Sequence, residues 1–108
     1  MIRKYPIYPD RIRTTPKQFS WVDHRLIRDR HLKGLTHQAA ALYLFLITVA
    51  DSQGLSYYAN HSLGQHLAME EAVLLAARGC LVRAGLIAYQ EPLYQVLDLT
   101  PQGTGGRP

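Results

Sequence analysis

Cysteine is almost absent from this chain of 108 residues, and Cys80 is the only one. An intrachain disulfide is therefore excluded, and so is a zinc site built from paired cysteines. The longest apolar run, Ala39 to Ile47, is far shorter than the roughly 20 residues that span a bilayer. The amino terminus also lacks the apolar core of a signal peptide. We expect a soluble protein in the reducing cytoplasm, with no membrane partner.

Acidic residues are scarce in the first third of the chain. Met1 to His37 carries nine Lys and Arg against three Asp, a net charge of +6, whereas Gln38 to Pro108 has a net charge of −2. A basic segment beside a near-neutral domain is typical of polyanion binding, most often of nucleic acid. The alternative is a solvated segment that serves solubility. The candidate nucleic-acid-binding residues are Arg3, Lys4, Arg11, Arg13, Lys17, Arg25, Arg28, Arg30 and Lys33.

Signals for catalysis are also lacking. Of the five histidines, His61 and His66 stand five positions apart, which places them on different faces of a helix rather than at one metal. The adjacent Glu70 and Glu71 diverge around a helix and cannot act as an acid–base pair. Gly103 to Gly106 is followed by no helix that would complete a phosphate-binding loop. We expect no enzyme activity, no metal and no cofactor.

Proline spacing divides the chain. Residues 1–18 contain three prolines among scattered bases and show no helical or alternating period, which predicts an extended basic arm. Tyr5, Ile7 and Tyr8 are apolar exceptions within it, and they indicate docking on the arm's own domain or on a partner. Residues 19–99 are predicted to fold as one domain, and 100–108 to be a disordered tail.

Caps, stops and apolar spacing predict the elements of that domain. Asp23 is expected to cap a short helix to about Arg30, with Leu26 and Ile27 facing inward. Thr36 is the expected cap of a helix that reaches Ala50 and is apolar almost all round, so it must be buried. The remaining predicted elements are a strand over 55–58, a helix over Ser62–Leu67 capped by Asn60, a helix over Glu70–Ala84 that stops at Gly85, and a hairpin of strands Leu86–Tyr89 and Tyr94–Leu99.

Two segments carry a family resemblance. Leu63 to Met69 resembles the Leu-Ala-x-x-Leu-Gly-Ile turn of winged helix-turn-helix proteins, with Ala68 in the place of the glycine. Leu81 to Ile87 is similar to that family's Leu-x-x-x-Gly-Leu-Ile, where a helix ends and the wing begins. The chain most resembles winged-helix domains of plasmid and phage replication initiators and of mobile-element proteins. The resemblance implies a mainly α-helical fold with a small β-hairpin.

The resemblance also implies that the helix over Glu70–Ala84 enters the major groove with its first turns on base edges. The residues there argue against this, because Glu70 and Glu71 would be repelled by phosphates and the alanines that follow offer no hydrogen bond. The wing segment contains no Lys or Arg. We therefore expect nonspecific DNA contact through the basic arm and the first helix.

The same helix suggests a second function of a different class. If Leu74, Ala77 and Leu81 face the core, the opposite side of the helix presents small and apolar residues. An exposed stripe of this kind usually marks a protein interface, which would join a homodimer or dock a partner without reading DNA. The alternative is that the arm or the tail covers the stripe within one chain. The candidate interface residues are Ala72, Leu75, Ala76, Gly79 and Val82.

Overall fold

The computed structural model describes residues 3–99 of the chain, so the expected tail over 100–108 lies outside the described residues. One 3₁₀ turn, four α-helices and three strands follow one another along this part of the chain. They are η1 (Pro9–Arg11), α1 (Arg25–Arg28), α2 (His37–Val49), β1 (Leu55–Tyr57), α3 (Asn60–Leu67), α4 (Glu71–Arg83), β2 (Ile87–Gln90) and β3 (Leu93–Val96).

Helix α2 packs one side against α4 and the sheet. Its predicted cap is confirmed, because the backbone N–H of Ala39 donates to Thr36 Oγ1 over 3.0 Å and so satisfies one of the free donors of the first turn. The helix ends at Val49, one residue before the predicted end. Ala39, Leu42 and Leu46 on one side are fully buried, but Ala41 and Leu44 on the other side are exposed, so the helix is not buried on most sides as expected.

The strands form an antiparallel sheet in the order β1-β3-β2. The predicted hairpin is confirmed, but its turn is shorter than expected, since Gln90 and Leu93 already pair in the ladder and leave two residues between them. The predicted strand over 55–58 joins the other edge of β3, with Ser56 opposite Tyr94. At the turn before β1, Gly54 has φ +84°, and a Cβ there would lie 2.6 Å from the Val96 carbonyl oxygen, so only glycine fits.

Helices α3 and α4 are joined by a tight turn. Ala68, in the position of the family's glycine, adopts the left-handed conformation that glycine favours, with φ +55°. Helix α4 stops before Gly85, as predicted, and buries Leu74, Ala77 and Leu81. The expected capping role of Asn60 is wrong: Ala59 holds the cap position, and no side chain caps α3.

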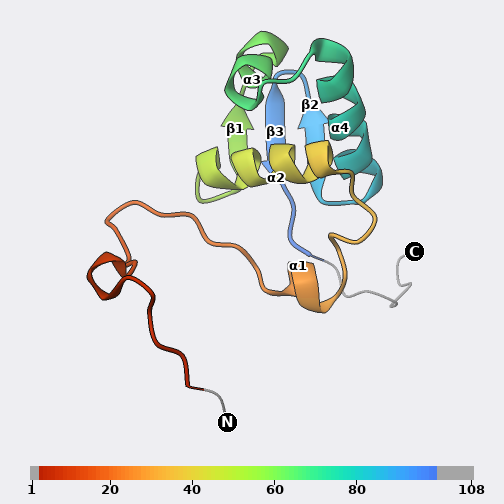
Figure 1. The fold of residues 1–108 in the computed structure, drawn as a ribbon. Helices are drawn as coiled ribbons and strands as arrows, with labels where there is room; N and C mark the ends of the chain where they lie inside the picture. The colour runs from red at the N-terminus through yellow and green to blue at the C-terminus, as the bar shows by residue number, and fades with distance from the viewer. Residues whose placement is uncertain (1–2, 100–108) are drawn as a thin grey trace.

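Helix α2 packs against α4 and the sheet, and α3 lies beside the first turns of α4 (Figure 1). The order helix, strand, helix, helix, hairpin, together with the small antiparallel sheet, is a mixed α/β arrangement compatible with a winged-helix-like fold. None of the helices within residues 3–99 combines the length and hydropathy needed to cross a membrane.

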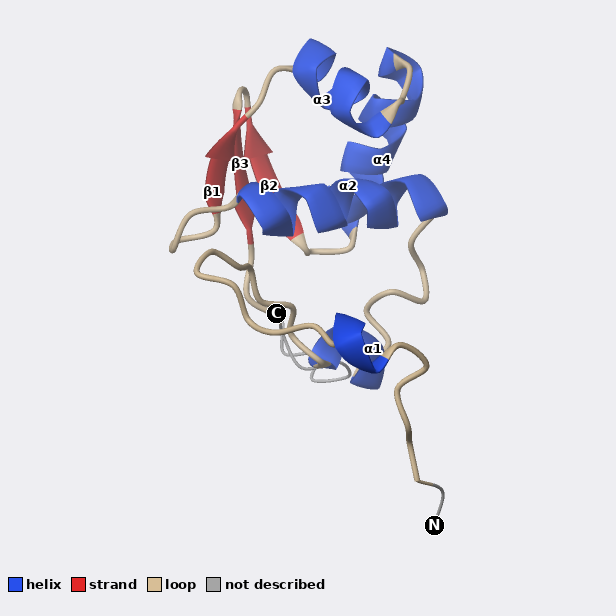
Figure 2. Cartoon of the chain, turned by 60° about the vertical axis from the view of Figure 1, so that its left-hand side comes forward, coloured by secondary structure: helices blue, strands red, loops and turns tan. Residues whose placement is uncertain are grey.

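The amino-terminal segment stands apart from this domain (Figure 2). Residues 3–22 are exposed throughout, and the radius of gyration of 16.2 Å exceeds the about 13 Å of a compact chain of about 100 residues. In α1, Leu26 is buried but Ile27 is 71% exposed, contrary to expectation. Adjacent residues point in different directions around a helix, and α1 has four residues and a single packed face.

We predict that Leu42→Ala lowers the free energy of unfolding by about 2–5 kcal/mol, because it leaves a cavity in the centre of the core. Leu44→Ala, on the exposed side of the same helix, is the matched control and changes it by less than about 0.5 kcal/mol. Urea denaturation of the two variants measures both values. Equal losses would contradict the placement of α2.

Candidate nucleic-acid interface

The structure places the nine candidate cations on the arm and around α1. Eight of them are exposed, and Arg25 is half-buried. On the arm, Asp10 is the one acidic residue among the five cations Arg3, Lys4, Arg11, Arg13 and Lys17. The arm therefore offers several guanidinium and ammonium groups to solvent, without ion pairs among the described residues that would neutralise them.

Arg25 differs from the other eight cations. Its guanidinium is bonded to the Asp23 carboxylate, with 2.6 Å between Nη2 and Oδ2, and Asp23 Oδ1 also accepts from the Arg25 backbone N–H over 2.9 Å. These hydrogen bonds from Arg25, reinforced by the charge of Arg28, lower the pKa of Asp23 from 3.8 to about 2. The pair fixes the start of α1 and leaves Arg25 with little charge to offer a polyanion.

The cations and the turn between α3 and α4 lie at opposite ends of the molecule. In both Figure 1 and Figure 2 the arm and α1 are at the bottom, whereas α3 and the beginning of α4 are at the top. A duplex held by the arm would therefore lie away from the first turns of α4, the region that reads bases in helix-turn-helix proteins.

The first turns of α4 present no base-reading groups. Glu70 and Glu71 are exposed there. The nearest cation on this helix, Arg78, points to α3 and the hairpin. Its Nη1 donates to Asn60 Oδ1 in α3 over 2.8 Å and to the Tyr94 hydroxyl in β3 over 2.7 Å. Its guanidinium also lies 4.1 Å from the centre of the Tyr89 ring, a cation–π contact.

This role of Arg78 was not predicted from the sequence. The cap prediction failed because α3 already begins at Asn60, which makes Ala59 the cap residue, and the Asn60 Oδ1 accepts from Arg78 instead. One signal was present: Arg78 stands four residues after Leu74 and three before Leu81, which places a cation on the core side of the helix. An arginine at such a position needs partners within the fold.

The apolar stripe of α4 is open to solvent. Ala72, Leu75, Ala76 and Val82 are exposed, Leu75 and Val82 each to 44%, and Gly79 is half-buried. A Cβ at Gly79 would lie 3.0 Å from Arg83 Nη1, so the Arg83 side chain lies over it. The apolar arm residues do not cover the stripe, since they are themselves exposed, Tyr5 to 74% and Ile7 to 88%.

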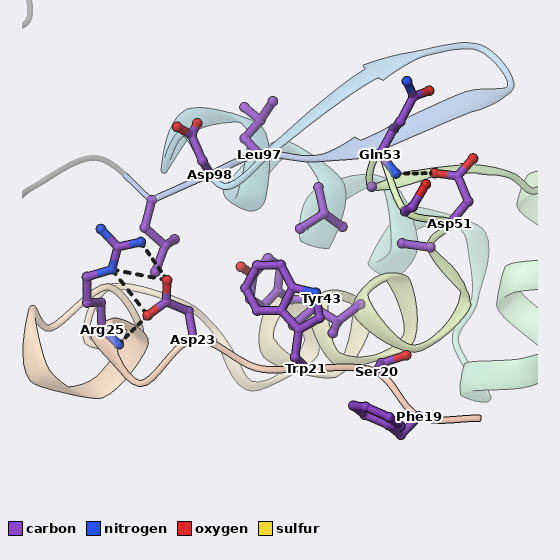
Figure 3. Close-up of a pocket in the computed structure, with 16 residues that line it drawn as sticks. Phe19, Ser20, Trp21, Asp23, Arg25, Tyr43, Asp51, Gln53, Leu97 and Asp98 are labelled. Atoms are coloured by element: carbon purple, nitrogen blue, oxygen red, sulfur yellow. Dashed lines mark hydrogen bonds and ion pairs between the residues drawn. The ribbon is translucent and has the colours of Figure 1, made fainter. Parts of the chain in front are cut away.

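A cavity of about 430 Å³ opens where the arm meets the domain (Figure 3). Its walls are the segment from Phe19 to Trp21, one face of α2, the turn before β1 and the segment after β3. Ser20 Oγ donates to the Thr48 carbonyl oxygen over 3.0 Å and ties the first wall to α2. The sequence does not predict this cavity, because its walls are brought together from separate parts of the chain.

Within residues 3–99, no three His, Cys, Asp or Glu side chains lie close enough together to hold a metal ion. Cys80, the free thiol, is half-buried in α4. The described residues thus present exposed cations, an exposed apolar stripe and the cavity beside Trp21 among their surfaces for partners.

Comparison with known proteins relates the fold to one solved structure. A Rep–DNA complex superimposes with a TM-score of 0.56 over 81% of this chain and 79% of that chain, at 17% sequence identity. No protein-family model and no curated protein matches the chain. At this identity the likeness shows the fold alone.

We predict that the Asp23 carboxyl titrates near pH 2 in the folded protein and returns toward 3.8 in Arg25→Ala. Because its pKa is lowered on folding, Asp23 stabilises the start of α1 above pH about 4, and this contribution is lost as the pH falls through about 2. Carboxyl-carbon NMR measures both titrations. Identical midpoints in the two proteins would show that Arg25 is not the cause.

Proposed function

We propose that this protein is a winged-helix module that binds DNA nonspecifically through its basic arm and the surface around α1. The observation that supports the proposal is the separation of charge: exposed cations gather at one end, while α4 begins with Glu70 and Glu71. The likeness in fold to a protein solved as a Rep–DNA complex is a second support. Association with replication or with a mobile element is part of the same proposal.

The binding follows from the electrostatics of DNA. Each phosphate neutralised by Lys or Arg releases condensed counterions, a term that depends on salt and not on sequence. An extended arm can span up to about 3.3 Å per residue, so the arm cations can follow the phosphate backbone over several nucleotides. Arg28, Arg30 and Lys33 would add contacts where the arm joins the domain, whereas Arg25 remains with Asp23.

We predict that replacing Arg11, Arg13 and Lys17 together with Gln weakens DNA binding and lowers the slope of log K against log salt by about 3, since each phosphate contact contributes about 0.9. Fluorescence anisotropy with a duplex of arbitrary sequence, measured across a salt series, gives both quantities. A duplex of unrelated sequence binds equally well in this proposal.

The matched control is Glu70→Gln with Glu71→Gln, which removes two carboxylates at the start of α4. DNA held at the arm end lies beyond the roughly 10 Å over which charges act in 0.1 M salt, so this variant binds like the wild type. Tighter binding by the control variant, or unchanged binding by the arm variant, would contradict the proposed mode and place α4 at the DNA.

A second candidate function is protein interaction through the α4 stripe, without DNA reading. The exposure of Leu75 and Val82 favours it, because a contact that buries apolar surface stabilises the complex by about 25 cal/mol for each Å² buried. The small residues between them allow a partner helix to approach closely. A second copy of the chain is the simplest partner.

We predict that, in this second function, Ala76→Arg converts a dimer into a monomer, because it inserts a bulky charge where helices pack closely. Ala41→Arg, at an exposed position of α2, is the control and leaves the mass unchanged. Light scattering at several concentrations reports the mass. A mass unaffected by Ala76→Arg would exclude a homodimer through the stripe.

A further inference from the structure

The cavity beside Trp21 has a charge opposite to that of the segment it adjoins. Three carboxylates line it, those of Asp23, Asp51 and Asp98, against the single guanidinium of Arg25. Asp23 is paired with Arg25, which leaves Asp51 and Asp98 to set a negative potential. Both are exposed at the rim, so the cavity repels phosphates and attracts cations. A nucleic acid is therefore the wrong occupant.

The cavity is also apolar and of the size that binding sites have. Tyr43, Ile47 and Val96 contribute to its floor and walls. Trp21 is among the lining side chains (Figure 3) and is 76% exposed. Its volume of about 430 Å³ falls within the about 300–1,000 Å³ that is usual for ligand pockets. An occupant that suits it combines aromatic or aliphatic side chains with positive charge.

The beginning of the arm has this chemistry. Arg3 and Lys4 precede three large apolar side chains, Tyr5, Ile7 and Tyr8, which are exposed to 74%, 88% and 65%. Burying such side chains lowers the free energy, and nothing in the described part of the chain covers them. The cations of the arm and the carboxylates of the cavity are complementary.

The arm is directed away from its own cavity. Phe19 to Trp21 already form one wall, and from there the chain leaves the domain in both views (Figures 1 and 2). The backbone already turns once at Pro9–Arg11, where the Arg11 N–H donates to the Tyr8 carbonyl oxygen over 3.0 Å, and residues 3–8 lie exposed beyond that turn. They would have to fold back along their own arm to reach their own cavity, whereas a second copy can present its arm directly.

We propose that the cavity is the docking site for residues 3–8 of a second copy of this chain, so that two copies exchange arms. Tyr5, Ile7 or Tyr8 enters the apolar cavity beside Trp21, and Arg3 and Lys4 lie against Asp51 and Asp98. No residue of α4 lines this site, so the exchange is independent of the α4 stripe. It leaves Arg11, Arg13 and Lys17 available for phosphates and does not depend on the proposed function.

Charge reversal tests the exchange. The arm variant is Arg3→Glu with Lys4→Glu, and the cavity variant is Gln53→Lys with Asp98→Lys. Asp51 is left intact because its Oδ1 accepts from the backbone N–H groups of Gln53 and Leu55 and holds the turn. Light scattering measures the mass, and the emission of Trp21, the sole tryptophan, reports occupation of the cavity.

We expect the wild type to double its mass with concentration, with a blue shift of Trp21 emission over the same range. Each variant alone stays monomeric with solvated Trp21. An equimolar mixture of the two regains the twofold mass and the blue shift, because the basic arm then meets an acidic cavity and the acidic arm a basic one. Recovery in the mixture also shows that both variants are folded.

A wild type that stays monomeric, or a mixture that does not recover the twofold mass, would overturn the proposal. Burial of Trp21 in a monomer would also overturn it, because the chain's own arm would then fill the cavity. A dimer that survives both charge reversals and dissociates with Ala76→Arg would place the interface at the α4 stripe instead. The cavity variant retains DNA binding in every case if the proposed function holds. Loss of arm exchange and failure of DNA binding are thus measured separately.

Discussion

The burial of α2 is the constraint on which the rest of this structure depends. The helix is apolar on most of its surface, so it is stable only when other elements cover it. Helix α4 and the sheet supply that cover, and Leu42 and Leu46 lie fully buried at their junction. With the buried side of α2 covered in this way, α3 and α4 are held at one end of the domain, and α1 and the arm remain at the other.

That enclosure separates the charges of the molecule. The cations of residues 3–33 cannot be buried with α2, because an unpaired charge in the core is too costly, and they remain on an arm and a short helix outside it. One cation within the domain, Arg78, is retained by Asn60, Tyr94 and Tyr89, and so it ties α4 to α3 and the hairpin. The surface that the first turns of α4 expose is apolar and acidic, unlike that of a helix that reads bases.

The elements of the domain were largely predictable because local rules and tertiary packing agree. The cap at Thr36, the stop at Gly85 and the inward positions Leu74, Ala77 and Leu81 follow from side-chain hydrogen bonding, backbone freedom and helical period. Predictions failed where the exact start or the length of a helix decided the outcome. Helix α3 begins at Asn60, so the side chain of Asn60 does not cap it and instead accepts a hydrogen bond from Arg78. Ile27 lies on a helix that is too short to have a second packed side.

For the candidate sites, the sequence alone determined which residues carry charge, which face of α4 is apolar and that the arm is extended, since composition and periodicity are local properties. Only the tertiary structure decided that Asp23 holds Arg25, that the cations lie away from the start of α4 and that Trp21, Asp51 and Asp98 meet around one cavity. The Asp23–Arg25 pair is local in the chain, but no pattern distinguished Arg25 from the neighbouring cations. The other two relations join residues that are far apart in the chain, and only packing brings them together.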